Sequence, residues 1–252
     1  MRLSLFEIET IVRMKNKFFG EVTKIYLFGS RVDDTQKGGD IDLYIELENV
    51  DETVSGKVRE LLVDLKHIIG EQKIDIIVSK DKTRLIEIEA QKGIELNLEK
   101  IKLEKYFNEC DKHLQRIEEA YTDIKDALPL TVQKYKTLSK DEVQDIDQYL
   151  YRFSKLQDTL GQKIFKLVLS IFEPSNEVIP FLDMLNKLEK LNFIDSAKEW
   201  LNLRDIRNKI AHQYDDEPQE MTQAINDILN QKEILKSIYN NVKQKYETLY
   251  SY

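Results

Sequence analysis

The sequence has few of the residues that cross-link, bend or anchor a chain. Its 252 residues include 1 cysteine, 4 prolines, 3 histidines and 1 tryptophan. A single cysteine excludes an intramolecular disulfide framework and a zinc site built from several cysteines. No apolar run approaches the roughly 20 residues that span a bilayer, and the N-terminus lacks the basic-then-apolar layout of a signal peptide. We therefore expect a cytoplasmic protein that makes no membrane contact.

A surplus of basic charge is absent as well. The chain carries 38 basic and 46 acidic side chains, which gives a formal net charge of -8. Any contact with nucleic acid must therefore come from a local basic patch and not from the field of the whole protein. The length of the chain and its hydrophobic content of 41% are sufficient to fill the cores of two domains.

The N-terminal part contains strand patterns that end in small or acidic residues. Residues 24–28 form a short apolar and aromatic run, which predicts a buried strand, and Gly29 and Ser30 follow at once. A small pair at the end of a strand lets backbone N–H groups approach an anion closely. This turn is therefore a candidate phosphate site.

Acidic side chains follow on the next two predicted strands. Strict alternation over residues 40–47 places apolar side chains on one strand face, so that Asp40 and Asp42 share the other. The strand predicted for residues 74–78 turns Asp75 away from its own apolar face in the same way. Two carboxylates at this spacing repel each other unless a cation lies between them, and hard oxygen ligands suit Mg²⁺ bound to triphosphate oxygens. Asp75 supplies a third acid, as a metal ligand or a base.

Helical periodicity indicates how the rest of the chain is organised. Apolar spacing predicts helices over residues 5–18 and 53–69 around the strands, which makes residues 1–100 a small α+β domain. Beyond Glu95 the strand signal is lost, and residues 101–252 are expected to form an all-α helical bundle. The predicted helices of this bundle cover residues 102–127, 140–172, 179–191, 194–212 and 218–250.

The bundle carries a polar stretch near the end of one predicted helix. Arg207 lies away from the apolar side of that helix and is followed by His212 and Tyr214. On one ideal helix Arg207 and His212 would be separated by roughly 140°. Either the helix ends near His212, or the site combines residues from two copies of the chain. A histidine that titrates near neutrality can move the proton of a ribose 2′-hydroxyl, and an arginine can hold the scissile phosphate.

The order of the N-terminal motifs resembles that of the minimal nucleotidyltransferase family of the polymerase-β-like superfamily. The resemblance covers residues 5–98 and rests on the succession of strand, Gly-Ser, loop, Asp-x-Asp strand, helix and third-Asp strand. The loop is slightly shorter than in the commonest form of the family motif. The family implies a Mg²⁺-dependent transfer from ATP, with Asp75 as the base. It implies a metal site made of Asp40, Asp42 and Asp75, and a nucleotide site made of Gly29, Ser30 and Arg31.

The spacing of Arg207, His212 and Tyr214 resembles the Arg-x-x-x-x-His-x-Tyr signature of HEPN-domain ribonuclease toxins. This second resemblance spans residues 102–250, and residues 149–158 look like the core helix of that family. It implies a metal-independent endoribonuclease that dimerises to build a composite site and that acts on RNA, with transfer RNA as the target class. Such toxins are encoded beside minimal nucleotidyltransferase antitoxins that attach AMP to the tyrosine of the signature. The resemblance thus implies a single-chain toxin–antitoxin protein in which AMPylation of Tyr214 silences the ribonuclease.

Two other interpretations of the same features are open. An α/β nucleotidyltransferase followed by a helical bundle also describes aminoglycoside nucleotidyltransferases, although that class does not explain Arg207, His212 and Tyr214. The second alternative is a non-catalytic module whose helical part binds a partner or a nucleotide. His67 and His113 lack metal-ligand companions, and we expect both at the surface.

Overall fold

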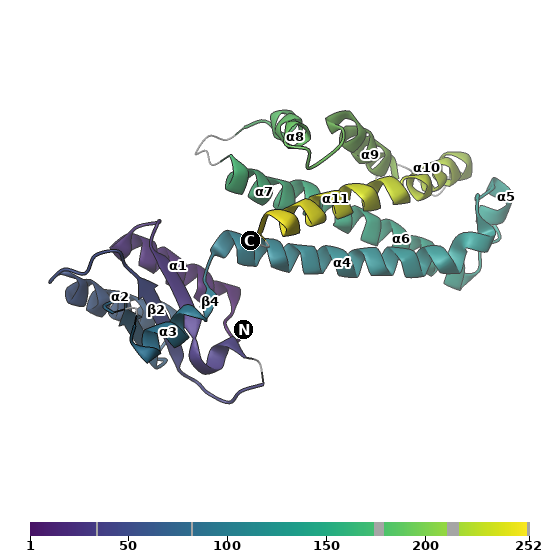
Figure 1. The fold of residues 1–252 in the computed structure, drawn as a ribbon. Helices are drawn as coiled ribbons and strands as arrows, with labels where there is room; N and C mark the ends of the chain where they lie inside the picture. Colours follow the sequence, from purple (N-terminus) through teal and green to yellow (C-terminus); the bar gives the residue numbers. More distant parts are fainter. Residues whose placement is uncertain (34, 82, 174–178, 211–216, 251–252) are drawn as a thin grey trace. The chain divides into compact units, whose positions relative to one another are not determined.

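The computed structural model describes residues 1–33, 35–81, 83–173, 179–210 and 217–250 (Figure 1). The chain divides into two compact units, Met1–Ile101 and Lys102–Tyr252. The first unit is a small mixed sheet with helices and the second is helical, which confirms the fold class predicted from the sequence. No helix within the described ranges is long and apolar enough to cross a membrane.

The first unit alternates helices and strands along the chain. Its elements are α1 (Leu5–Phe19), β1 (Lys24–Phe28), the 3₁₀ turn η1 (Gly29–Val32), β2 (Ile41–Glu46), α2 (Val54–Ile69), β3 (Ile74–Val78), α3 (Leu85–Gln91) and β4 (Ile94–Glu95). The strands form one sheet in the order β3-β2-β1-β4. β2 pairs with β3 in parallel, whereas β1 is antiparallel to β2 and to β4. The end of β1 therefore lies beside the start of β2, and the start of β2 lies beside the start of β3.

The sequence pattern explains how this unit begins and where its core lies. α1 starts at a capping box, in which Ser4 Oγ accepts the Glu7 N–H at 3.2 Å and the Glu7 carboxylate accepts the Ser4 N–H at 2.7 Å. Alternation along β2 buries Ile41, Leu43 and Ile45 completely. These side chains form one core with apolar residues of α1, α2 and β1. The apolar face of β2 is therefore packed against the helices. The other face starts with acidic side chains.

The second unit consists of helices of unequal length. They are α4 (Leu98–Ile124), the 3₁₀ turn η2 (Lys125–Ala127), α5 (Val132–Tyr135), α6 (Lys140–Thr159), the π-helical turn η3 (Leu160–Ile164), α7 (Phe165–Phe172), α8 (Phe181–Lys190), α9 (Ala197–Ile210), α10 (Pro218–Asn230) and α11 (Lys232–Tyr250). Their apolar faces share one core, which contains the fully buried aromatic residues Tyr149, Phe153 and Phe165 and the nearly buried Trp200.

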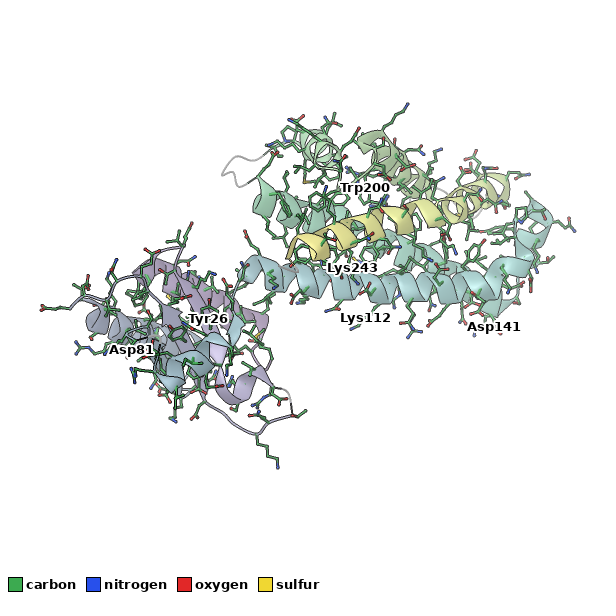
Figure 2. All side chains as sticks on the ribbon, viewed as in Figure 1. Tyr26, Asp81, Lys112, Asp141, Trp200 and Lys243 are labelled. Atoms are coloured by element: carbon green, nitrogen blue, oxygen red, sulfur yellow. The ribbon has the colours of Figure 1, made fainter. Side chains whose placement is uncertain are left out.

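Ion pairs join α11 to α4, and Figure 1 shows these two helices side by side. Lys232 Nζ and Lys236 Nζ each lie 2.7 Å from a carboxylate oxygen of Glu118. Further along α11, Lys243 Nζ lies 2.7 Å from Asp111 Oδ2, and Figure 2 labels this lysine between the two helices. These pairs favour one register between α4 and α11.

The structure corrects the expectation that His113 lies at the surface. Only 7% of His113 is exposed, and its Nδ1 lies 3.3 Å from Arg152 Nη1. Burial, followed by the charge of Arg152, lowers the pKa of His113. Histidine 113 is therefore a neutral part of the packed helical unit, whereas His67 is exposed as expected.

Two predicted helices are interrupted. The helix predicted over residues 218–250 is broken at Gln231, whose N–H turns back to Ile228 O at 3.0 Å, so that it forms α10 and α11. The helix predicted over residues 140–172 is continuous, but η3 gives it one π-helical turn. Such a turn inserts a residue into the helix and changes which side chains face the same side before and after it.

Candidate active site

Strand pairing brings the three predicted carboxylates to one end of the sheet. Asp42 is opposite Asp75 in the parallel register of β2 and β3, and opposite Phe28 in the antiparallel register of β1 and β2. Asp40 immediately precedes β2, whose first N–H donates to the carbonyl of Lys73 at 2.9 Å. Residues paired in register project from the same face of a sheet, and so do residues two apart on a strand. All three acids therefore lie on one face.

Gly29 is required by the close approach of Asp42. The φ of Gly29 is +69°, in the left-handed region that disfavours side chains, and a Cβ at this position would lie 2.3 Å from Asp42 Oδ2. Ser30 follows in η1 and is approached just as closely, because a Cβ on Gly38 would lie 2.1 Å from Ser30 Oγ. The two glycines thus let backbone lie directly against polar side chains of the site.

Lys73 lies between two of the acids. Its Nζ is 2.5 Å from Asp40 Oδ2 and 3.5 Å from Asp75 Oδ2. Burial, followed by repulsion from Asp75 and Asp40, raises the pKa of Asp42. The site therefore carries negative charge that a cation would stabilise. Lys73 was absent from the predicted set, although its place two residues before Asp75 puts both side chains on one strand face.

Arg31, which the sequence analysis assigns to the nucleotide, makes contacts within the protein. Its Nη2 donates to Gly39 O at 2.5 Å and to Gln72 Oε1 at 2.9 Å, and its Nη1 lies 3.7 Å from Glu7 Oε1. The guanidinium group thus anchors the loop that precedes β2. A nucleotide-binding role for Arg31 stays a prediction.

Arg2 is a second anchor of this loop, and the sequence analysis missed it. Its Nη2 donates to Ser30 O at 2.7 Å, and its Nη1 donates to Gly38 O at 2.9 Å. Its backbone N–H donates to Arg31 O at 2.8 Å. No local pattern predicts these bonds, because their partners lie about 30 residues away in the chain.

The three carboxylates fit a divalent cation if the ammonium group of Lys73 moves away from them. Three carboxylates supply the hard oxygen ligands that Mg²⁺ prefers, and burial, followed by repulsion from Asp75 and Asp40, raises the pKa of Asp42. Among the residues that the structure describes, no group of three or more His, Cys, Asp or Glu side chains is arranged to hold a metal ion. The ammonium group of Lys73 pairs with both Asp40 and Asp75. Its side chain is 65% exposed, so it has room to turn into solvent if a cation binds.

The family of the first unit follows from its sequence. Residues 8–102 match the family model described as Polymerase beta, Nucleotidyltransferase. The matched range contains the turn at Gly29 and all three acids, and it covers less than half of the chain. The first unit is thus a nucleotidyltransferase domain, which confirms the N-terminal resemblance at the level of the family. No curated protein and no solved structure matches the chain.

We expect Gly29→Ala to impair the nucleotidyltransferase domain by moving Asp42. The added Cβ must push the carboxylate aside, and a misplacement of about 1 Å can lower a rate by roughly 10²-fold. The left-handed backbone adds a loss of about 1–2 kcal/mol in the free energy of unfolding. Urea denaturation measures the stability, and transfer of label from α-labelled ATP measures the activity.

Gly20→Ala is the matched control. Gly20 has a φ of +86°, and a Cβ there would meet nothing within 4 Å. It should lose at least as much stability, because its ψ of 165° places it in a region that essentially only glycine adopts, and it should keep its transfer rate. If both variants lose transfer equally, the contact between Gly29 and Asp42 is irrelevant to activity.

Arg207, the predicted phosphate ligand of the helical unit, lies on α9 against α6. Its Nη2 lies 2.6 Å from Asp158 Oδ1, and its Nε donates to Gln157 Oε1 at 3.2 Å. A quarter of the side chain is exposed. His212 and Tyr214 lie outside the described residues, so the structure places Arg207 alone of the predicted three. Two partners on α6 hold its guanidinium group in a fixed direction.

Proposed function

We propose that the first unit transfers AMP from ATP in a Mg²⁺-dependent reaction. Asp40, Asp42 and Asp75 would hold the metal ion, and the turn at Gly29 and Ser30 would bind the triphosphate. Bound Mg²⁺ would neutralise the charge of the triphosphate and of the departing pyrophosphate. The observation that carries this proposal is the approach of Gly29 to Asp42, within a domain that matches the nucleotidyltransferase family.

Tyr214 is the acceptor in this proposal. Its phenolic oxygen forms a bond to the α-phosphorus of ATP, while the bond from that phosphorus to the bridging oxygen breaks and pyrophosphate leaves. The phenol proton passes to Asp75, whose side chain is 57% exposed and therefore open to an incoming group. Asp42 is less suited to this step because it lies against Gly29.

The helical unit would be a HEPN-type ribonuclease that acts as a homodimer. His212 would take the proton of a ribose 2′-hydroxyl as that oxygen attacks the neighbouring phosphorus. The bond to the 5′-oxygen would break, which leaves a 2′,3′-cyclic phosphate and a 5′-hydroxyl that takes its proton from water. Arg207 would stabilise the charge on the phosphoryl oxygens. Support comes from α6, because residues 149–158 resemble the HEPN core helix and also include both partners of Arg207.

AMPylation of Tyr214 should switch the ribonuclease off. An attached AMP would bring a phosphate charge close to Arg207 and would block the approach of RNA. Incubation with ATP and Mg²⁺ should therefore add one AMP to the intact mass, on the peptide that contains Tyr214, and should stop RNA cleavage. Tyr214→Phe should prevent both effects.

Tyr151→Phe is the matched control, because Tyr151 is 55% exposed in the same unit. It should accept AMP on Tyr214 as wild type does. Tyr239 and Tyr246 are 1% and 4% exposed, so label on either would show that the acceptor was not chosen by accessibility. AMP on another tyrosine contradicts the switch, and AMP on no residue favours a small-molecule acceptor.

The local charge around Arg207 argues against an aminoglycoside as that acceptor. The pocket beside Arg207 is also lined by Lys166 and Arg204, against a single carboxylate from Asp158. Aminoglycosides are polycations, which such a surface repels. The anionic phosphates of RNA are attracted to it instead.

A further inference from the structure

The sheet of the first unit has an open edge at β3. Among the described strands β3 pairs with β2 alone, whereas the opposite edge is formed by β4, which is only 2 residues long. Edge strands are commonly protected from further pairing by lysine or proline, and β3 contains neither. Its single charge is Asp75, which belongs to the proposed metal site. The edge is therefore open to an additional strand.

The bonds between β3 and β2 identify the backbone groups that face outward. The N–H that starts β2 donates to Lys73 O at 2.9 Å, and the N–H of Ser79 donates back to β2 at 3.0 Å. Lys73 and Ser79 therefore face β2, as do the odd-numbered residues between them, because the direction of the N–H and C=O groups alternates along a strand. The backbone groups of Ile76 and Val78 consequently point away from the sheet.

A groove with a volume of about 480 Å³ follows this edge. Its apolar lining comes from β3, from the first turns of α2 and from the loop before α2, and consists of Ile76, Ile77, Val78, Val54, Val58 and Val50. Val50 is 43% exposed, and Ile76 and Ile77 are partly buried. Ligand sites measure roughly 300–1,000 Å³, so the groove has room for side chains of a bound segment.

Three cations surround the apolar lining. Arg59, Lys80 and Arg84 line the groove together with it, and no carboxylate of a described residue does. All three cations are exposed. Arg84 Nη1 lies 3.4 Å from Glu87 Oε1, whereas Arg59 and Lys80 form no ion pair with a described residue. The groove therefore attracts negative charge.

The loop that follows β3 is held in place by Glu87 of α3. Glu87 is fully buried, and its Oε1 accepts the N–H of Lys80 at 3.2 Å and that of Asp81 at 3.3 Å. On the other side of the loop, Ser79 Oγ donates to Leu47 O at 2.8 Å. Figure 2 labels Asp81 in this loop. These bonds fix the end of the groove before a partner binds, which lowers the entropic cost of binding.

We propose that the edge of β3 binds an extended, acidic segment of a partner polypeptide. The segment adds a strand to the sheet, and its backbone pairs with the outward N–H and C=O groups of β3. Its apolar side chains pack in the groove, and its carboxylates pair with Arg59, Lys80 and Arg84. The same cations repel a basic segment. This binding does not depend on the transfer chemistry proposed for Asp42 and Asp75.

The probe is a short fluorescein-labelled peptide in which glutamate and valine alternate. Its anisotropy should rise saturably when it is titrated with the full-length protein in EDTA and without ATP. The affinity should fall as salt is added, because exposed charges are screened. The corresponding peptide of lysine and valine should not bind. Equal binding of both peptides, or binding of neither, would overturn the proposal.

Methylated backbones test the addition of a strand directly. Along an extended peptide, successive N–H groups point to opposite sides, so only one set can pair with β3. One peptide is therefore methylated at every valine nitrogen, and a second at every glutamate nitrogen. One of the two should lose binding and the other should keep it. If both bind, or if neither binds, the segment does not pair with β3.

Arg59→Glu tests the groove and Lys66→Glu is its matched control. Arg59→Glu should weaken binding of the glutamate peptide roughly tenfold, because an attraction becomes a repulsion. Lys66→Glu makes the same change of charge at an exposed site of α2 outside the groove and should bind as wild type does. Thermal melts show whether both variants are folded. Equal weakening in both would reveal a general effect of net charge and refute the groove.

A second copy of the chain is the alternative occupant of the edge. Sedimentation of wild type and of Arg59→Glu distinguishes the two occupants. Loss of peptide binding with an unchanged oligomeric state supports the partner segment. A change of oligomeric state in Arg59→Glu, with no peptide binding by wild type, would assign the edge to a contact between copies and overturn the proposal. Neither readout requires nucleotidyl transfer, so failure of the transferase leaves the groove testable.

Discussion

Asp42→Asn is expected to abolish nucleotidyl transfer and to leave the first unit folded. The substitution keeps the shape of the side chain and removes the charge that is proposed to bind the metal ion. A metal ion contributes several kcal/mol of charge stabilisation, and about 4 kcal/mol corresponds to roughly a 10³-fold loss in rate. Transfer of label from α-labelled ATP in Mg²⁺ measures this loss.

Stability should move in the opposite direction from activity. A carboxyl group whose pKa is higher in the folded protein than in the unfolded chain stabilises the fold only while it is protonated. That contribution is lost as the pH rises through the folded pKa, so at pH 7 the ionised Asp42 opposes folding. Asp42→Asn should therefore unfold at the same temperature as wild type or at a higher one.

Glu48→Gln is a suitable control, because Glu48 is an exposed acid just beyond β2. It should keep both transfer and stability.

Lys73→Met should make the stability of the protein depend on Mg²⁺. It removes the cation that pairs with Asp40 and Asp75, so it should destabilise the protein without Mg²⁺ and regain stability when Mg²⁺ is added. Unchanged labelling by Asp42→Asn would refute the metal site.

The sequence was sufficient for the strands that build this site. Period-two alternation in residues 40–47 and 74–78 predicts β2 and β3, and parallel pairing then sets Asp42 opposite Asp75. The turn at Gly29 was predicted for a phosphate, but its contact with Asp42 was not. That contact depends on the pairing of β1 with β2, which a local pattern does not specify.

Contacts between distant residues account for most of what was missed. Arg2 anchors the loop before β2 through bonds to carbonyl groups 28 and 36 residues away, and Arg31 bonds to the side chain of Gln72, 41 residues away. Helix α3 was also missed, since Leu85 and Ile86 at its start are 81% and 45% exposed and do not form a buried stripe. Short elements of this kind are held by tertiary contacts, which override local preference.

For His113, in contrast, the local sequence contains a pattern that predicts burial. It lies three residues after the buried Cys110 and four before the buried Ile117, so it continues the apolar stripe of α4. Its polarity suggested the surface, but spacing decided its burial. The π-helical turn η3 was not predicted, because the stretches on both sides of it have the apolar spacing of an ordinary α-helix.

His212→Ala should nearly silence RNA cleavage, because loss of a general acid–base group lowers a rate by about 10²–10⁴-fold. Arg207→Ala should have a comparable effect through loss of phosphate stabilisation. Both are best measured in an Asp42→Asn background, where Tyr214 stays unmodified and the ribonuclease is not switched off. Cleavage by the parent should persist in EDTA, since neither proposed group needs a metal ion.

Arg207 also has a structural role, so its variants need a second readout. Arg207→Ala leaves the buried Gln157 Oε1 without its donor, and an unpaired buried group costs about 1–3 kcal/mol of stability, whereas the side chain of Asp158 is 35% exposed to water. Arg207→Lys keeps the charge but loses the planar fork that reaches both partners. If cleavage depends on the phosphate contact, the lysine variant should recover part of the rate, and Arg116→Ala, an exposed arginine of α4, should lose none. Cleavage that survives both His212→Ala and Arg207→Ala in a folded protein would exclude the HEPN-type ribonuclease and leave the helical unit as a non-catalytic module.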